Sequence, residues 1–136
     1  MARKAKALVL DSWAVLAYLG NEASGQQVAD LIANAHEDRI PMCMSIVNAG
    51  EVWYILAREI SEAQADKAVA DLTNLGIELV DADWPLTRSA GMFKARHRMS
   101  YADCFAAALA KERKSDLVTG DKEFKQVEVE VNIRWL

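Results

Sequence analysis

Ala7-Leu8-Val9-Leu10-Asp11 decides the fold, because four apolar residues run without a break into an acid. A short apolar run of this kind predicts a buried strand, and the acid marks its carboxyl end. A second such run, Leu117-Val118-Thr119-Gly120-Asp121, lies near the other end of the chain. In open α/β sheets, ligands bind beyond the carboxyl ends of the strands, so both acids are predicted to lie at the ligand-binding edge.

Apolar segments of strand length alternate with segments of helical periodicity along the chain. Strands are expected at residues 7–10, 40–44, 77–80 and 116–119, with an edge strand at 127–131. Helices are expected at residues 12–19, 24–35, 45–58, 61–75 and 101–114, and another begins at 83–85. Strands separated by helices imply right-handed crossovers and a parallel sheet covered on both faces. The predicted fold class is α/β, a three-layer α/β/α sandwich around a mainly parallel sheet of four to five strands, in one domain over residues 1–136.

Local signals set several of these boundaries. Ser61 and Gln64 form a capping-box pattern that starts one helix, and Gly76 closes it. Strict alternation at Val127-Glu128-Val129-Glu130-Val131 predicts the edge strand, with one face in water. The helix at 45–58 is expected to bury a stripe formed by Ile46, Ala49, Gly50, Trp53, Leu56 and Ala57.

The composition limits the possible classes of protein. The 136 residues are 52% hydrophobic, which suits a domain with a real core and not a disordered chain. A formal net charge of −4 argues against a protein that binds nucleic acid over its whole surface. Cys43 and Cys104 lie in apolar stretches without a CxxC pattern, so we expect buried thiols and no structural zinc.

The N-terminal residues Arg3, Lys4 and Lys6 precede apolar residues and faintly resemble a secretory signal. Asp11 interrupts that apolar run after four residues, and no segment reaches the length of a membrane span. We therefore expect a cytoplasmic protein with no membrane partner.

A basic segment lies between Trp84 and Ala102, which enclose no acid. Its cations are Arg88, Lys94, Arg96 and Arg98. These side chains are candidates for contacts with the phosphate backbone of a nucleic acid. Cations also complement the dipole at the carboxyl end of a helix, and the sequence leaves both interpretations open.

Four acids lie at or beside the predicted carboxyl ends of strands: Asp11, Glu51, Asp103 and Asp121. Taken singly, Asp11 and Asp103 could cap helices, Asp121 could stabilise a turn, and Glu51 could face solvent. However, residues 40–57 hold no charge other than Glu51. Carboxylates brought together repel one another, and a hard divalent cation with oxygen ligands neutralises them. Together the four acids predict a Mg²⁺ or Mn²⁺ site.

The chain resembles the PIN domain family, specifically its small VapC-like members. The matching stretches are residues 9–19 (VLDSWAVLAYL), 45–51 (SIVNAGE), 100–110 (SYADCFAAALA) and 117–124 (LVTGDKEF). They follow in the family's order and together span nearly the whole chain. The resemblance implies a metal-dependent endoribonuclease whose products carry a 5′-phosphate and a 3′-hydroxyl.

Motif position also implies roles for individual residues. The catalytic acidic quartet would be Asp11, Glu51, Asp103 and Asp121. Asp11 and Asp103 are expected to bind the metal directly, and Glu51 and Asp121 either directly or through water. Ser12 and Thr119 match small hydroxyl positions of the family and would steady water or carboxylates. VapC-like proteins are typically the toxin half of a toxin–antitoxin pair and commonly dimerise, so the expected partners are an RNA substrate, an antitoxin and a second copy of the chain.

Other interpretations remain open from the sequence. The chain could keep the fold and act as a non-catalytic binding module. An aspartate-based phosphotransfer enzyme is a weaker alternative, because a haloacid-dehalogenase-type site needs a second acid where Trp13 stands. The four tryptophans are expected to be core or interface anchors and not base-stacking platforms: Trp13, Trp53, Trp84 and Trp135. His36 and His97 are expected at the surface.

Overall fold

The computed structural model describes residues 7–20 and 22–136, and the expectations for Arg3, Lys4 and Lys6 lie outside the described residues. The strands are β1 Leu8–Leu10, β2 Met42–Ser45, β3 Ile77–Val80, β4 Asp116–Thr119 and β5 Ile133–Trp135. The helices are α1 Ser12–Leu19, α2 Ala23–Asp38, α3 Ile46–Glu59, α4 Glu62–Asn74, α5 Trp84–Arg96 and α6 Tyr101–Arg113, followed by the 3₁₀ helix η1 Lys122–Val127.

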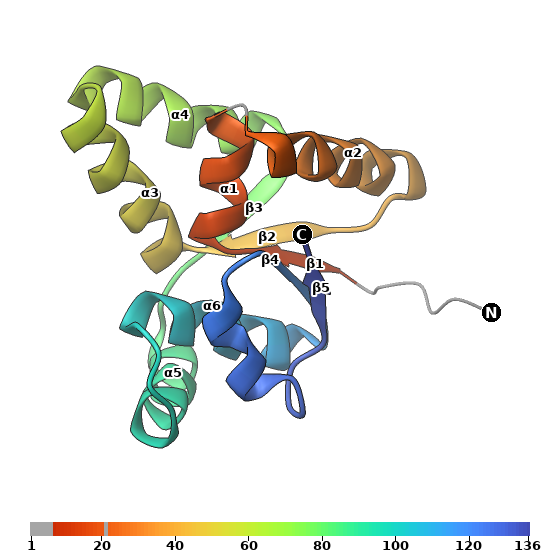
Figure 1. The fold of residues 1–136 in the computed structure, drawn as a ribbon, viewed down its shortest axis with the longest axis vertical. Coiled ribbons are helices and arrows are strands. Elements are labelled where there is room, and N and C mark those ends of the chain that lie inside the picture. Colours follow the sequence, from red (N-terminus) through yellow and green to blue (C-terminus); the bar gives the residue numbers. More distant parts are fainter. Residues whose placement is uncertain (1–6, 21) are drawn as a thin grey trace.

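The five strands form one sheet in the order β3-β2-β1-β4-β5, and each neighbouring pair is parallel. Helices α1 to α4 cover one face of this sheet, and α5, α6 and η1 cover the other (Figure 1). The prediction of a three-layer α/β/α sandwich with a parallel sheet is therefore confirmed.

The central strand β1 is buried on both faces. Val9 packs into the core on the α5–α6 side, whereas Leu8 and Leu10 pack into the core on the α1–α4 side. A strand covered on both faces needs a continuous apolar run and not an alternating pattern. That requirement explains why residues 7–10 are apolar without interruption and why the acid can stand only at the strand's end.

Polar caps start the helices where the sequence predicted them. The side chain of Ser61 accepts a hydrogen bond from Gln64 N at the start of α4, and that of Ser100 accepts one from Asp103 N at the start of α6. Gly76 has φ +86° after α4, a conformation that glycine adopts without steric cost. These caps let two helices begin directly after short loops, and one of them carries Asp103 on its first turn.

The predicted edge strand at 127–131 is wrong. Residues Lys122–Val127 form η1, a turn follows, and the edge strand is β5 at Ile133–Trp135. Val127 and Val131 are buried, and Val131 N donates to Val127 O at 2.9 Å, whereas Val129 is 95% exposed. Two buried residues four apart belong on one side of a helical turn, so the alternation of Val and Glu reflected helical spacing.

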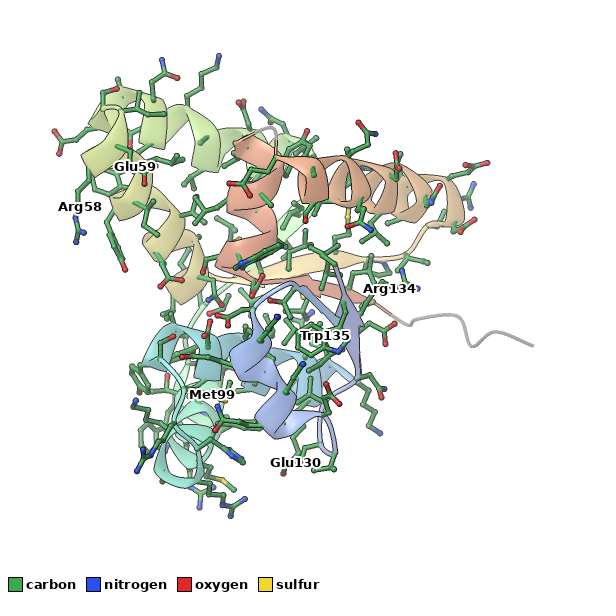
Figure 2. All side chains as sticks on the ribbon, in the orientation of Figure 1. Arg58, Glu59, Met99, Glu130, Arg134 and Trp135 are labelled. Atoms are coloured by element: carbon green, nitrogen blue, oxygen red, sulfur yellow. The ribbon has the colours of Figure 1, made fainter. Side chains whose placement is uncertain are left out.

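The predicted buried stripe of α3 is also partly wrong. Ala49 is buried, but Gly50 is exposed and Ile46 is 39% exposed, while Val52 and Asn48 are fully buried. Helix α3 packs against α1, α4 and α6 together, so its neighbours and not its apolar pattern set its buried face. Figure 2 shows the far end of this helix, at Arg58 and Glu59, away from the sheet.

Cys43 and Cys104 are both buried and free, as expected. Burial raises the pKa of each thiol to about 11, which keeps them protonated and unreactive. Within residues 7–20 and 22–136, no helix combines the length and the apolar character that crossing a membrane requires.

Candidate metal centre

The four predicted acids come together at the carboxyl edge of β1 and β4, the two strands at the middle of the sheet. Asp11 follows β1 and caps α1, while Asp121 follows β4. Leu10 pairs with Val118 in the register, so the residues just beyond them, Asp11 and Thr119, are neighbours across the two strands. Glu51 on α3 and Asp103 in the first turn of α6 reach the same edge from above and below the sheet.

Asp11 is the most deeply buried of the four acids, with 1% of its surface exposed. Its two carboxylate oxygens accept hydrogen bonds from Ala14 N at 2.8 Å and from the Thr119 hydroxyl at 2.5 Å. Burial raises the pKa of Asp11 to about 7, the two hydrogen bonds oppose that rise, and the nearby charges of Asp121 and Glu51 add to it. The hydrogen bonds hold the side chain in one orientation at the floor of the site.

Thr119 connects this floor to the acid beyond β4. Its hydroxyl donates to Asp11 Oδ2 and accepts from Asp121 N at 3.0 Å, and Asp121 Oδ1 accepts from Glu123 N at 2.9 Å. One side chain therefore fixes both Asp11 and the backbone that carries Asp121. The Thr119 hydroxyl therefore makes the kind of hydrogen bonds that the expected supporting role would need.

Ser12 has the corresponding place beside Glu51. The Ser12 hydroxyl donates to Glu51 Oε1, and it accepts from Asn48 Nδ2 at 3.2 Å. Asn48 Nδ2 also donates to Ala102 O at 3.0 Å, so one amide ties α1 and α3 to the start of α6. Among the described residues, Asn48 Oδ1 is the buried side-chain oxygen without a hydrogen-bond partner.

Asn48 is a functional candidate that the sequence analysis missed. It lies one helical turn before Glu51 in an otherwise apolar stretch, and a polar residue in such a stretch is the sequence feature that could have identified it. A buried amide with an unpaired oxygen costs stability. Its presence beneath the acids is therefore better explained by the arrangement of the site than by packing.

One carboxylate oxygen from each of Asp103, Asp121 and Glu123 lies within 4.8 Å of the other two. We call these three residues the acidic trio. Asp103 is 7% exposed, and burial is the main cause that raises its pKa to about 8. Repulsion from Asp121 and Asp11 and hydrogen bonds with Asp121 and Glu123 raise it further. The arrangement favours a shared proton or a bound cation over three free charges.

Glu123 is the second residue that the sequence analysis missed. It lies two positions after Asp121, and the tight turn into η1 brings both side chains to the same side. Two acids two residues apart were visible in the sequence, but only the 3₁₀ turn makes them neighbours in space.

A hollow of about 350 Å³ opens above these groups. Its acidic wall is formed by Glu51, Asp103, Asp121 and Glu123, with Ser12 and Ser100 beside them. Three of the four predicted acids line the hollow, and Asp11 is buried next to its lining, adjacent to Ser12 and within electrostatic range of Asp103. Several carboxylate oxygens at short range are the donor set that Mg²⁺ and Mn²⁺ take, so the residues fit the predicted cation. Direct ligation by Asp11 stays a prediction.

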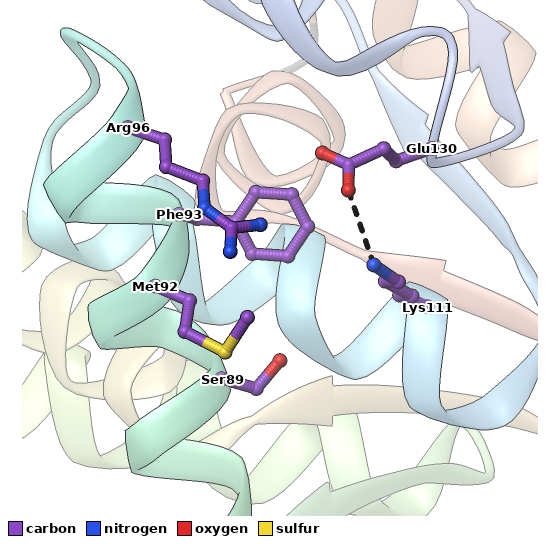
Figure 3. A pocket seen from close by; sticks show the side chains of 6 residues that line it. All are labelled: Ser89, Met92, Phe93, Arg96, Lys111 and Glu130. Carbon is purple, nitrogen blue, oxygen red and sulfur yellow. Dashed lines mark hydrogen bonds and ion pairs between the residues drawn. The ribbon is translucent and has the colours of Figure 1, made fainter.

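The basic segment lies on α5 and the loop after it, and its cations do not line the hollow. Lys94 Nζ donates to Met99 O at 2.7 Å, and the Arg88 guanidinium contacts Met92 Sδ at 3.5 Å. Arg96 lies beside Phe93 at the α5–α6 surface, where Lys111 pairs with Glu130 at 3.1 Å (Figure 3). Contacts between nucleic acid and Arg88, Lys94, Arg96 or Arg98 remain a prediction from charge.

Comparison with known proteins identifies the family. The family model for the PIN domain matches residues 8–130. Among curated proteins, none matches the sequence significantly. The fold is similar to a chain in the crystal structure of VapBC2 from Rickettsia felis bound to promoter DNA, at TM-score 0.72 and 18% identity over 95% of this chain and 98% of that one.

Two further solved structures show the same fold. DNA-bound VapBC from Salmonella typhimurium matches at TM-score 0.71 and 18% identity, over 94% of this chain and 96% of that one. VapC20 from Mycobacterium tuberculosis, described as a sarcin-ricin loop cleaving toxin, matches at TM-score 0.68 and 18% identity, over 89% and 95%. The acids at the carboxyl edge, the parallel sheet and the match over residues 8–130 together show that this chain belongs to the PIN domain family.

Proposed function

We propose that this chain is a metal-dependent endoribonuclease and the toxin component of a toxin–antitoxin pair. The observation that carries the proposal is the acidic trio, with Glu51 and Asp11 beside it, in a hollow at the carboxyl edge of the sheet. Such clustering of desolvated carboxylates is costly in a protein that only binds a partner. The cost is therefore better explained by catalysis than by a non-catalytic binding module.

In this proposal Asp103, Asp121 and Glu123 would hold Mg²⁺ or Mn²⁺, with Glu51 and Asp11 nearby, and the support is the short distance between the three carboxylates. A divalent ion in such a site activates water and stabilises the charge that develops on a phosphodiester during hydrolysis. The chain's own hydrogen bonds fix where these carboxylates stand: Thr119 orients Asp11, and Ser12 orients Glu51. Rigid placement of this kind reduces the reorganisation that the reaction needs.

The proposed partners are suggested by the solved structures that share this fold. Two of the similar solved structures are described in these terms: VapBC-5 from Mycobacterium tuberculosis, as a member of the VapBC family of toxin–antitoxin systems, and a toxin–antitoxin complex from Klebsiella pneumoniae. We propose that the chain is likewise bound by an antitoxin, forms a homodimer and acts on RNA in the cytoplasm. Expression of the chain alone is expected to arrest growth, and Asp103→Asn is expected to relieve that arrest.

Cleavage of RNA by the purified chain tests the proposal. The parent is expected to cut RNA with Mg²⁺ or Mn²⁺ and to stop when EDTA is added. Asp103→Asn and Asp121→Asn are expected to lower the rate by at least about 100-fold, because each removes a charged oxygen ligand from the metal site. Asp38→Asn, at the exposed end of α2, is the matched control and should cut normally. Cleavage by Asp103→Asn at the parent's rate would show that these acids are not the catalytic centre.

A further inference from the structure

Beside its acidic wall, the hollow has an apolar wall, which a metal site alone does not explain. Trp13 and Leu16 come from α1, and Ile55 comes from α3. Each helix thus supplies one polar and one apolar part of the hollow: Ser12 is adjacent to Trp13, and Glu51 lies one turn before Ile55. The hollow thus offers an acidic wall that suits a cation, or a group held by a cation, and an apolar wall that suits a flat or apolar group.

Gly120 holds the Trp13 ring in place. A Cβ atom at Gly120 would lie 2.3, 2.5 and 2.6 Å from three consecutive carbons of the Trp13 ring, Cη2, Cζ3 and Cζ2. Such similar distances occur only if that position lies over the face of the ring, because an approach to its edge would leave the two outer carbons much farther away. The backbone at Gly120 therefore packs flat against one face of the indole. The half-buried ring turns its other face or its edge to the hollow.

We propose that Trp13 is a stacking platform for a nucleobase of the RNA, next to the phosphate group at the acidic trio. This inference rests on the proposed ribonuclease function. A nucleotide is the ligand class that combines a phosphate group, which a divalent cation can hold at the carboxylates, with a flat ring that stacks on an indole. The hollow is of the size that small-molecule sites have, which favours a nucleotide over a peptide helix.

For Trp13 this inference departs from the expectation that the four tryptophans are core or interface anchors, and for the other three that expectation stays a prediction. Trp84 is 71% exposed, and Trp13 lines the site itself. The sequence places Trp13 two residues after Asp11, but nothing in the sequence shows that Gly120, more than a hundred residues later, would support its ring.

Binding of small probes tests the platform without RNA cleavage. The probes are adenosine 5′-monophosphate and ribose 5-phosphate, which differ only in the base, each titrated in the presence of Mg²⁺ by ligand-observed NMR. The parent is expected to bind adenosine 5′-monophosphate about tenfold or more tightly than ribose 5-phosphate, because one base stacks. Trp13→Ala is expected to remove that preference and leave the affinity for ribose 5-phosphate unchanged.

Two further variants guard against a simple folding defect. Gly120→Ala places a methyl group where the ring lies, so the ring must move, and the base preference is expected to fall although Trp13 is still present. Trp84→Ala, on the exposed surface of α5, is the matched control and should keep the preference. The thermal midpoint of each variant shows whether it has folded.

Equal affinity of the parent for the two probes, binding of neither, or an unchanged preference in folded Trp13→Ala would overturn the inference and leave the apolar wall as a surface for a protein partner. Failure of the ribonuclease proposal is read separately, from the absence of RNA cleavage by the parent. A base preference that depends on Trp13 in a chain without cleavage would support a nucleotide-binding site and reject the nuclease.

Discussion

The floor of the acidic centre, at Asp11, and its open side, at the acidic trio, hold carboxylates in opposite ways. Asp11 accepts hydrogen bonds from Ala14 N and the Thr119 hydroxyl, so its charge is met by donors of the protein itself. Asp103 faces two other carboxyl groups, those of Asp121 and Glu123. The difference teaches that burial raises the pKa of both acids, but only at Asp11 do hydrogen-bond donors of the protein oppose that rise, whereas on the open side neighbouring carboxyl groups add to it.

The largest expected consequence is a dependence of stability on pH. The pKa values of Asp11 and Asp103 are raised to about 7 and about 8 in the folded protein, and in the unfolded chain both return to about 4. Between these values the folded protein keeps protons that the unfolded chain has lost. The free energy of unfolding without metal should therefore fall as the pH rises from about 5 to about 8, by at most about 1.4 kcal/mol per pH unit for each group.

Magnesium should reverse this trend, because the cation replaces the protons that the acids have released. The rise in thermal midpoint caused by Mg²⁺ is expected to be small at pH 5 and larger at pH 8. Thermal unfolding at several pH values, with Mg²⁺ and with EDTA, measures both effects. Asp103→Asn should remove the share of the slope that Asp103 contributes and leave the share of Asp11. A metal-free midpoint that is constant from pH 5 to pH 8 would contradict the raised pKa values of both acids.

A second prediction compares the two sides by removing one carboxylate from each. Asp11→Ala removes a helix cap and leaves the Thr119 hydroxyl without its acceptor, and these losses offset the relief of removing a desolvated carboxyl, so we expect this variant to be less stable than Asp103→Ala by about 1–3 kcal/mol in metal-free protein. Asp103→Ala removes a carboxyl group that burial and its neighbours destabilise, so we expect a change near zero or a gain. Chemical denaturation at pH 8 in EDTA measures both. Equal destabilisation by the two variants would show that the open side is held as firmly as the floor.

The sequence predicted the floor of the site better than its open side. Asp11 stands at a strand end, a position that follows from an apolar run that stops at a polar residue, whereas Ser12 and Thr119 were suggested by the family resemblance. The strand at 77–80 and the cap at Ser61 were also predicted from short local patterns. Local rules of this kind need only a few neighbouring residues, and the tertiary structure agrees with them.

The errors lie where distant segments decide. The alternation at 127–131 suited a strand, but Val127 and Val131 are buried by packing of η1 against the core below α6. Asn48 is buried because α1 and α6 both contact α3 at that point. Glu123 joins the acidic trio through a 3₁₀ turn that no periodicity announces. Each error comes from a contact between elements that are far apart in the sequence, or from a turn that no repeating sequence pattern predicts.

Glu123 gives the smallest and most specific prediction about the open side. Its carboxylate lies in the acidic trio, but the family pattern contains only four acids, so Glu123 is expected to tune metal binding and not to be indispensable. Glu123→Gln removes one charge and keeps the shape, and we expect the Mg²⁺ concentration for half-maximal thermal stabilisation to rise about 3- to 10-fold, which corresponds to about 1 kcal/mol. Glu128→Gln, an exposed change one turn later, is the control. If Glu123→Gln and Glu128→Gln both titrate with Mg²⁺ like the parent, Glu123 does not contribute to metal binding. The cation would then be held by Asp103 and Asp121, although the carboxylate of Glu123 lies close to both.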